Sequence, residues 1–391
     1  MMDKVCVVTG TRADYGVLRP LLFKLRQNDH IDLQLVVTGS HLSEKFGDTQ
    51  REIQKDGFLD YIKVPILIED DSKEGMAFST GRALQKFAEL FAKGKPDLLV
   101  VLGDRFEIFA VTAAAHMIGI PTAHISGGDV TEGAVDDAIR HCITKMSVLH
   151  FPGCEQSRKR IIQMGEQPDM VFNVGELGVE NCLNLELMTK DALADDLQFE
   201  VIKDEYAVVT FHPVTMECNT AEKQLQELIH AMEQMPDLGY IVTLANADAG
   251  GRLINEIWMR EGKKHKNWLV VPSLGLLRYL SAVKYAKFVV GNSSSGVLEA
   301  PSMHTPTVNI GDRQKGRMMA ESIVCCEPRC KDIIEAMNAA LTDEFQKKAM
   351  RVVSPFGDGT TSDKILERII TFLKEKKSKH EKHFFDIEFS S

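Results

Sequence analysis

The chain has 391 residues, of which 44% are hydrophobic and 26% are charged, and its net charge is −10. This composition is typical of a soluble globular protein, and the length suffices for about two or three domains. It excludes collagen-like, disordered and disulfide-stapled chains. The acidic balance argues against a nucleic-acid partner but is compatible with a local basic pocket for a small anion.

Neither a targeting segment nor a metal pattern stands out. The first apolar stretch, residues 5–8, is too short for a signal peptide, and no later stretch reaches about 18 uninterrupted apolar residues. The cysteines form no CxxC pair, and the cluster at 325–330 lacks the histidines of a zinc site. We therefore expect a cytoplasmic protein with reduced thiols, no membrane partner and no metal.

Short apolar runs typical of buried strands alternate with helical patterns along the chain. The runs are continuous, as expected for parallel strands covered on both faces. In the first half the predicted strands are 5–8, 33–37, 97–103, 121–126, 149–151 and 171–175, and the predicted helices include 15–26, 135–146 and 155–164. After a polar linker with some helix at 183–204, the predicted strands are 206–211, 240–245, 268–271, 287–291 and 306–311, and the predicted helices include 221–235, 331–341 and 363–377.

These two series predict an α/β chain of two doubly wound parallel-sheet domains with a cleft between them. We place the first domain at 1–182, the second at 183–360, and a C-terminal helix and tail at 361–391. Ligands of such sheets bind at the carboxyl ends of the strands. Chemistry is therefore expected in the residues that directly follow each strand.

Three polar motifs follow predicted strands of the first half. TGTRADYG (9–16) carries Arg12 and matches neither the dinucleotide fingerprint nor the P-loop. GDR supplies an adjacent acid and base, Asp104 and Arg105. In HISGGDVTEGAVDD (124–137), two glycines permit close approach of a ligand and are followed by carboxylates that include Asp129 and Asp136. These residues could instead be a turn arginine, helix caps and a solvated helix face.

In the second half, FHP places His212 at the end of the first strand, and Asn246 follows the next. The strongest signal is GNSSSGVLE (291–299), where a strand runs into small hydroxyl residues and a helix start. Backbone N–H groups there, with Ser293 and Ser294, suit a phosphate. Glu299, one turn later, is placed to accept hydrogen bonds from ribose hydroxyls.

A later loop, GDRQKGR (311–317), supplies Arg313 and two further cations for a diphosphate. Taken in order, TGTRADYG, GDRFE, HISGGDVTEGAVDDAIRH, FHPVT, GNSSSGVLE and NIGDRQKGR resemble the hydrolysing UDP-N-acetylglucosamine 2-epimerases of bacterial sialic-acid biosynthesis. The resemblance implies a GT-B-like fold of two Rossmann-like domains, with the last helix returning to the first domain. It also implies a homodimer.

The implied reaction converts UDP-N-acetylglucosamine and water to N-acetylmannosamine and UDP, with no metal and no nicotinamide. UDP leaves as C2 loses its proton, giving a 2-acetamidoglucal. Water then adds to C1, while C2 is reprotonated from the opposite face. The UDP sugar is therefore the implied partner, and no cofactor is implied.

The resemblance also assigns roles. Asp104 and Asp136 match family carboxylates implicated in acid/base chemistry, and His212 matches the family histidine near the diphosphate. The positions that match nucleotide-binding residues are Arg12, Arg105, Ser293, Ser294, Glu299 and Arg313. The segments TRAD (11–14), HPVT (212–215) and SSSG (293–296) resemble those of the hydrolysing epimerases rather than those of the non-hydrolysing ones.

One departure from the family pattern concerns Ser126, which stands where many relatives have a glutamate held to be catalytic. A lone hydroxyl is a poor base, so we expect Ser126 to orient water or sugar and Asp129 or Glu132 to fill the space of the missing carboxylate. The departure leaves open the same reaction on UDP-2,4-diacetamido-2,4,6-trideoxy-glucose. The motifs are also compatible with a GT-B glycosyltransferase and with a noncatalytic nucleotide-sugar sensor.

Overall fold

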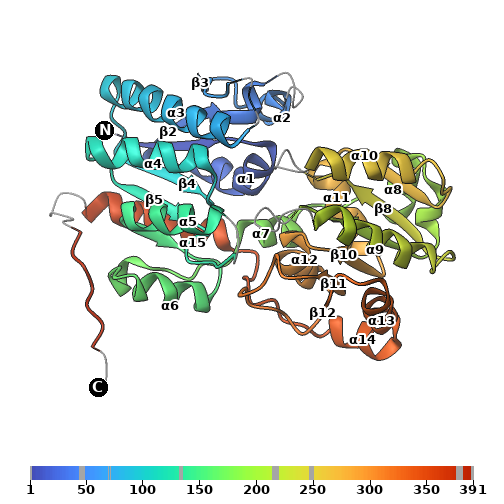
Figure 1. Cartoon of the computed structure of the whole chain (residues 1–391). Coiled ribbons are helices and arrows are strands. Elements are labelled where there is room, and N and C mark those ends of the chain that lie inside the picture. Colours follow the sequence, from blue (N-terminus) through green and yellow to red (C-terminus); the bar gives the residue numbers. More distant parts are fainter. Residues whose placement is uncertain are drawn as a thin grey trace. The chain divides into compact units, whose positions relative to one another are not determined.

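A computed structural model describes residues 2–43, 49–68, 70, 72–131, 135–213, 220–245, 251–375 and 382–388 (Figure 1). The chain divides into two compact units. Unit 1 is drawn from Met1–Asp129, Val135–Asn181 and Gly357–Ser391, and unit 2 is built on Cys182–Phe356. The first and last parts of the chain thus belong to the same unit.

Unit 1 contains a six-stranded parallel sheet in the order β3-β2-β1-β4-β5-β6. Its central strand β1 pairs on both sides, with Val5 opposite Leu33 of β2 and opposite Leu98 of β4. The strands are β1 (Asp3–Thr9), β2 (Ile31–Thr38), β3 (Ile62–Val64), β4 (Leu98–Leu102), β5 (Thr122–Ile125) and β6 (Leu149–Phe151). The helices are α1 (Arg12–Gln27), α2 (Gln50–Lys55), α3 (Lys73–Lys93), α4 (Phe106–Ile118), α5 (Val135–Met146), α6 (Glu155–Gln163), α7 (Leu177–Asn184) and α15 (Thr361–Glu375).

Unit 2 repeats this topology in the order β12-β11-β10-β7-β8-β9. Counted from its own first strand, each sheet has the order 3-2-1-4-5-6, which is that of a Rossmann domain. The strands are β7 (Tyr206–Thr210), β8 (Gly239–Thr243), β9 (Trp268–Val271), β10 (Phe288–Gly291), β11 (Thr307–Ile310) and β12 (Ile323–Cys326). The helices are α8 (Lys190–Leu197), α9 (Ala221–Glu233), α10 (Gly251–Glu261), α11 (Gly275–Tyr285), α12 (Ser294–Leu298), α13 (Cys330–Leu341) and α14 (Asp343–Ala349).

Each sheet is buried on both faces, as the continuous apolar runs predict. In β1, Val5 and Val7 join the core formed with α1 and α15, while Cys6 and Val8 join the core formed with α3 and α4. The same alternation divides β7 between two cores. Because helices cover both faces of the sheet, polar ligands can bind only at the ends of the strands.

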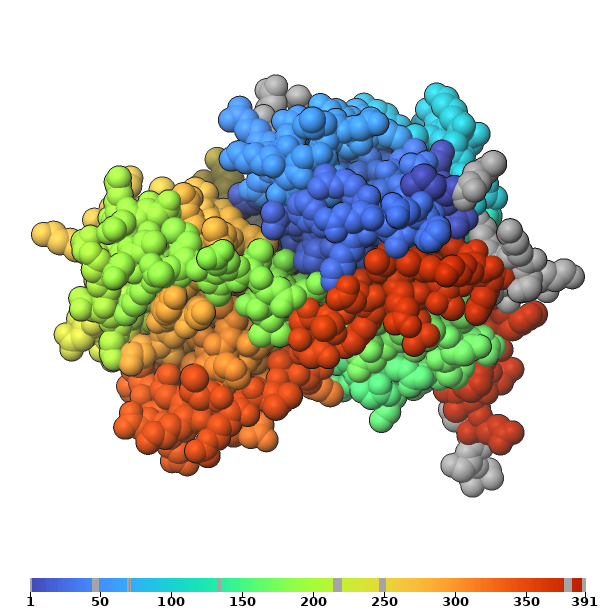
Figure 2. All heavy atoms as spheres, turned by 180° about the vertical axis from the view of Figure 1, so that it is seen from behind, coloured from blue at the N-terminus to red at the C-terminus, as the bar shows by residue number. Residues whose placement is uncertain are grey.

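The C-terminal helix α15 packs against α1, near the start of the chain. Figure 2 shows the red helix lying along the blue N-terminal segment. Ile365 and Ile369 are fully buried in the same core as β1, and Lys24 of α1 pairs with Asp363 at 2.6 Å. Residues from the two ends of the described chain therefore build one core.

The doubly wound parallel sheets are confirmed, but the prediction of strands is wrong in three places. Residues 171–175 form no strand: Val171 makes an isolated bridge to His150, and the segment leads into α7. The edge strands β3 and β12 were not predicted, because the exposed Lys63 interrupts β3 and β12 has no buried residue. The other two edge strands, β6 and β9, are mostly apolar runs and were predicted.

Candidate functional site

The strand order places a topological switch point in each sheet, between β1 and β4 in unit 1 and between β7 and β10 in unit 2. At a switch point the connections leave in opposite directions, which opens a crevice at the carboxyl ends of the strands. The motifs that follow these four strands are TGTRAD, GDR, FHP and GNSSS. Four of the predicted motifs thus lie at the two places where the fold favours a ligand.

In unit 1, Asp104 follows β4 and is held by Arg140 of α5. Arg140 Nε donates to Asp104 Oδ2 at 2.8 Å, and Arg140 Nη2 makes a second contact with the same oxygen. Arg140 Nη1 donates to the Asp129 carbonyl at 2.8 Å. The Arg140 side chain is 2% exposed and that of Asp104 25%. A buried cation thus orients a carboxylate that stays accessible to a ligand.

The charge of Arg140 is secured by its neighbours. Burial alone would lower the pKa of Arg140, but the nearby carboxylates, led by Asp104, outweigh burial and raise it. Asp137 contributes at 3.3 Å. Because the guanidinium stays charged, it holds the Asp129 main chain as well as Asp104 after β4.

His124 of β5 contacts the turn that carries Asp104. Its Nε2 lies 2.8 Å from the Gly103 carbonyl oxygen, and its Nδ1 lies 3.1 Å from Thr144 Oγ1. Complete burial lowers the pKa of His124 to about 3, so the ring is neutral. His124 is therefore a structural member of the HISGG motif.

A second acidic cluster at the switch point of unit 1 was not predicted. Arg105 Nε donates to Glu107 Oε1 at 2.7 Å, and Glu107 is 1% exposed. A Cβ at Gly10 would lie 2.7 Å from that same oxygen, so the glycine makes room for Glu107. GDRFE contained this residue, but its place in the first turn of a helix indicates only a favourable interaction with the helix dipole.

Asp14 of α1 completes this cluster. Burial raises the pKa of Asp14 to about 6; Arg105 opposes that rise and Glu107 adds to it. Asp14 Oδ2 and Glu107 Oε2 are buried without a hydrogen-bond partner among the described residues. Perturbed carboxyl groups at a strand end are typical of functional sites.

The carboxylate beside Ser126 is Glu176, which was also not predicted. Ser126 Oγ donates to Glu176 Oε2 at 2.7 Å. Glu176 directly follows residues 171–175, so the rule that chemistry follows a strand would have selected it.

The other predicted residues of unit 1 lie nearby on its elements. Asp129 Oδ1 accepts from Ser157 Oγ at 2.6 Å. Asp136 is exposed in the first turn of α5, one helical turn before Arg140, and Arg12 begins α1. Glu132 lies outside the described residues.

In unit 2, His212 and Asn292 tie the two switch-point strands together. The His212 backbone N–H donates to Asn292 Oδ1 at 2.7 Å, and Asn292 Nδ2 donates to the His212 carbonyl at 2.8 Å. Burial, with a contribution from Arg313, lowers the pKa of His212 to about 3. Its Nδ1 has no partner in the described parts of the chain. A neutral ring can exchange hydrogen bonds with a ligand but adds no charge.

Arg313 reaches the same turn. Its Nη1 donates to the Asn292 carbonyl at 3.0 Å, and Gln314 Nε2 donates to that oxygen at 2.9 Å. The structure thus brings together three predicted motifs: FHP, GNSSS and the basic loop. Arg313 brings a cation to the turn that follows β10.

The serines cap a short helix. Ser293 is the N-cap of α12, and its side chain accepts from the Ser295 N–H. Ser294 is the first residue of α12. Asn246 lies outside the described residues.

Glu299 accepts a hydrogen bond from a neighbouring side chain of unit 2. Ser295 Oγ donates to Glu299 Oε2 and accepts from the Tyr279 hydroxyl at 2.9 Å. Burial raises the pKa of Glu299, and the Ser295 hydrogen bond opposes the rise. One Glu299 oxygen is therefore already engaged in a hydrogen bond within the protein.

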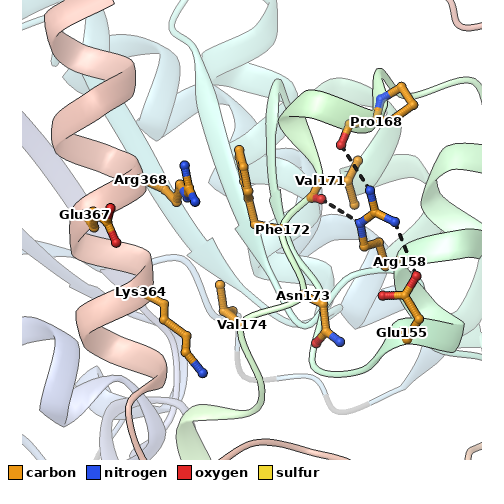
Figure 3. A pocket seen from close by; sticks show the side chains of 10 residues that line it. All are labelled: Glu155, Arg158, Pro168, Val171, Phe172, Asn173, Val174, Lys364, Glu367 and Arg368. Atoms are coloured by element: carbon orange, nitrogen blue, oxygen red, sulfur yellow. Dashed lines mark hydrogen bonds and ion pairs between the residues drawn. The ribbon is translucent and has the colours of Figure 1, made fainter.

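A hollow of about 440 Å³ between α6 and α15 differs in character from these strand ends (Figure 3). Three of the charged side chains there contact other protein groups. Arg158 donates to the Val171 carbonyl at 3.0 Å and pairs with Glu155 at 3.2 Å, and Arg368 stacks over Phe172. Such internal pairing is typical of a structural surface.

Neither a metal-binding cluster nor a membrane span occurs among the described residues. No group of three or more His, Cys, Asp or Glu side chains there is placed to hold a metal ion. None of the helices in the described ranges is long and apolar enough to cross a membrane.

Two Rossmann-like domains in one chain, with polar motifs at each switch point, define a GT-B-like α/β protein. The chain belongs to the UDP-N-acetylglucosamine 2-epimerase family, whose sequence model matches residues 23–370. The resemblance inferred from the motifs is thereby confirmed.

Three known proteins illustrate the relationship. The GDP/UDP-N,N'-diacetylbacillosamine 2-epimerase (hydrolyzing) of Campylobacter jejuni is 39% identical, over 88% of this chain and 89% of that protein. The polysialic acid biosynthesis protein P7 of Escherichia coli is 37% identical, over 99% and 98%. The solved structure of Neisseria meningitidis UDP-GlcNAc 2-epimerase bound to UDP-GlcNAc has a TM-score of 0.81 at 19% identity and covers 94% of this chain and 100% of that one. This last likeness supports the fold.

Proposed function

We propose that this protein is a hydrolysing 2-epimerase that converts UDP-N-acetylglucosamine and water to N-acetylmannosamine and UDP. The observation that carries the proposal is the Asp104–Arg140 pair at the switch point of unit 1. It supplies an accessible, oriented carboxylate where the fold favours a ligand. The hydrolysing relative from Campylobacter jejuni supports the reaction type.

Unit 2 holds the leaving UDP in this proposal. Arg313 and the amides and hydroxyls of Ser293 and Ser294 face the diphosphate, and the neutral His212 adds a hydrogen bond. Charge develops on the diphosphate as the C1–O bond breaks, so groups that stabilise it lower the barrier. Arg12, Arg105 and Glu299 are the remaining proposed UDP contacts.

Unit 1 carries the proton chemistry. The C2 proton is weakly acidic, so its loss requires C1–O cleavage to run ahead and build positive charge on the sugar. Asp104 and Asp136 serve as acid/base groups, each contributing a factor of about 10²–10⁴. Asp129 is held in place by the hydrogen bond that it accepts from Ser157.

A second candidate substrate is UDP-2,4-diacetamido-2,4,6-trideoxy-glucose. The Campylobacter jejuni relative is named for N,N'-diacetylbacillosamine, whereas the Escherichia coli relative is named for polysialic acid biosynthesis. The reaction would be the same on either sugar. Ser126, which departs from the family pattern, lies on the side where the sugar is expected.

One experiment tests the reaction and the substrate together. The protein is incubated in D₂O with each UDP sugar separately, UDP release is followed, and the sugar product is identified by NMR. We expect a free 2-epimerised sugar that carries deuterium at C2. A UDP-linked product, turnover only with an added sugar acceptor, or a product that retains its original C2 proton would contradict the proposal.

A further inference from the structure

Ser126 has a backbone conformation that its residue type disfavours. Its φ is +60°, in the left-handed region, although it is not a glycine. It directly follows β5, and its side chain is partly exposed. Non-glycine residues held in this region gather at functional sites, where the surrounding structure maintains the strain. The partner of the Ser126 side chain therefore has to be considered.

That partner, Glu176, is 6% exposed and firmly seated. A Cβ at Gly153 would overlap Glu176 Oε1, so the glycine after β6 makes room for the carboxylate. The Glu176 main-chain carbonyl accepts hydrogen bonds from the Val179 N–H at 3.1 Å and from Thr361 Oγ1 at 3.4 Å. Main chain and side chain are thus both held, with one carboxylate oxygen aimed at Ser126.

A capping role does not explain this carboxylate. Glu176 directly precedes α7, where Ser, Thr, Asp and Asn are the residues that cap a helix well. Its Oε2 accepts from Ser126, fifty positions earlier in the sequence. The buried carboxylate therefore reaches the surface through a partly exposed hydroxyl.

This pair lies at the same sheet edge as Asp104. The Gly103 N–H, next to Asp104, donates to the Ile125 carbonyl at 3.1 Å, and Ile125 immediately precedes Ser126. The Ser126 N–H donates to the Phe151 carbonyl at 3.0 Å. The hydroxyl and Asp104 therefore follow neighbouring strands at the edge where the sugar is expected.

We propose that Glu176 is a positioning residue that makes Ser126 the proton acceptor of the elimination step. This inference rests on the proposed hydrolysing epimerase reaction. Because Ser126 donates its own proton to Glu176, the lone pairs of Ser126 Oγ are left for an incoming proton. A carboxylate thus acts on the substrate indirectly, from position 176 through Ser126, in place of Asp129 or Glu132.

The elimination step is balanced in atoms and electrons. The C2–H bond breaks, its proton goes to Ser126 Oγ, and the Ser126 proton passes to Glu176 Oε2. The C2–H electron pair forms the C1=C2 bond, while the C1–O bond breaks and its pair leaves with UDP. Glu176 then returns the proton to water through Ser126. Reprotonation of C2 comes from the opposite face and does not involve this pair.

The test separates elimination from hydration. Ser126→Ala, Glu176→Gln and the double variant are assayed for UDP release, using whichever of the two UDP sugars the wild type hydrolyses faster. They are also assayed, with UDP present, for hydration of the corresponding 2-acetamidoglucal. We expect each single variant to lower kcat for UDP release by about 10²-fold or more, with UDP affinity and glucal hydration changed by less than about threefold.

The double variant provides the second criterion. Two residues that act as one unit give non-additive effects, so the double variant should be about as slow as the slower single variant. The proposal would be overturned if the rate losses of the two single variants multiplied in the double variant. It would also be overturned if UDP release and glucal hydration slowed equally, or if Glu176→Gln kept the wild-type kcat. A wild type that releases no UDP from either sugar would instead refute the proposed function.

Two controls separate chemistry from folding. Ser126→Gly also removes the hydroxyl but adopts a φ of +60° without strain, so it should melt at a higher temperature than Ser126→Ala and be equally slow. Glu180→Gln alters a neighbouring buried carboxylate that accepts from the Ser362 N–H at 2.6 Å. It should lower the melting temperature and leave kcat for UDP release within about threefold per folded molecule. If Glu176→Gln fails to fold, a Ser126→Gly variant with wild-type kcat would still overturn the proposal.

Discussion

At the scale of single residues, the site combines buried charged side chains that have enough partners with others that lack them. Arg140 is buried but satisfied by carboxylates, whereas Asp14 keeps a buried oxygen without a partner among the described residues. A buried carboxylate without enough partners favours its neutral form. Buried charged side chains of this site therefore differ in how they affect stability.

Replacing the acid/base carboxylates tests their roles directly. We expect Asp104→Asn and Asp136→Asn each to lower kcat by about 10²-fold or more, because the amide keeps the shape but loses the basic oxygen. UDP affinity, measured by calorimetry, should change little. Asp363→Asn on α15 is the control, since that carboxylate is exposed and its ion pair is with Lys24 of α1. Near-normal kcat in both variants would leave the two residues as helix caps.

Asp14 should make stability depend on pH. Its pKa is raised to about 6 by burial, so the folded state binds a proton more tightly than the unfolded chain, whose value is near 4. This contribution is present below about pH 4 and is lost as pH rises to about 6. Asp14→Asn should therefore be more stable than wild type by about 3 kcal/mol at pH 8 and roughly equal at pH 4. Urea unfolding at the two pH values measures this, and a pH-independent difference would contradict it.

At the scale of elements, the turn between β10 and α12 depends on its glycine. Gly291 has a φ of +138°, and a Cβ there would overlap the Thr210 carbonyl oxygen. The turn can therefore approach β7 closely enough for Asn292 and His212 to exchange hydrogen bonds. The close packing of two strand ends, together with the loop of Arg313, shapes the proposed diphosphate site. Because α12 has only five residues, its amides and hydroxyls matter more than a helix dipole.

The proposed diphosphate site can be tested by removing its contacts. We expect Arg313→Ala and Ser294→Ala each to weaken UDP binding, the arginine variant by at least about tenfold, because a charged hydrogen bond contributes about 1.5–3 kcal/mol. Calorimetric titration with UDP gives the affinities. Lys331→Ala, which removes an exposed cation from α13 of the same unit, should bind UDP normally. Unchanged affinity in the first two variants would place the phosphates elsewhere.

At the scale of the whole molecule, the chain builds the same topology twice and returns to complete the first copy. Helix α15 contributes Ile365, Ile369, Phe372 and Leu373 to the core that holds β1. Unit 1 therefore cannot bury that face of its sheet until the last helix has been made. Stability of unit 1 should depend on residues far along the chain.

Ile369→Ala tests this dependence. Removing a fully buried isoleucine should cost about 2–5 kcal/mol, and the loss should appear in unit 1. Hydrogen exchange is expected to show faster exchange for the amides of β1 than in wild type, with β7 unchanged. Glu367→Ala, exposed on the same helix, is the control. Equal loss of protection in both units would mean that they unfold together.

The sequence by itself determined the doubly wound class, the central strands and the motifs at their ends. Continuous apolar runs report burial on both faces, and burial on both faces is what defines the middle of a parallel sheet. The positions after these runs followed directly, which is why Asp104, His212 and Ser293 could be selected. Residues 171–175 were wrongly predicted to be a strand because Val171 and Val174 are buried like the apolar residues of a strand, although the segment does not pair along its length.

Only the tertiary structure decided which side chains act together. Arg140 meets Asp104, Arg105 meets Glu107, and Ser126 meets Glu176, and the first and last of these pairs join segments far apart in the sequence. The pairings depend on which strands are neighbours and on glycines that leave room for a carboxylate. Neither feature has a local signature, because contacts between distant segments are fixed by the packing of the whole unit rather than by the residues on either side.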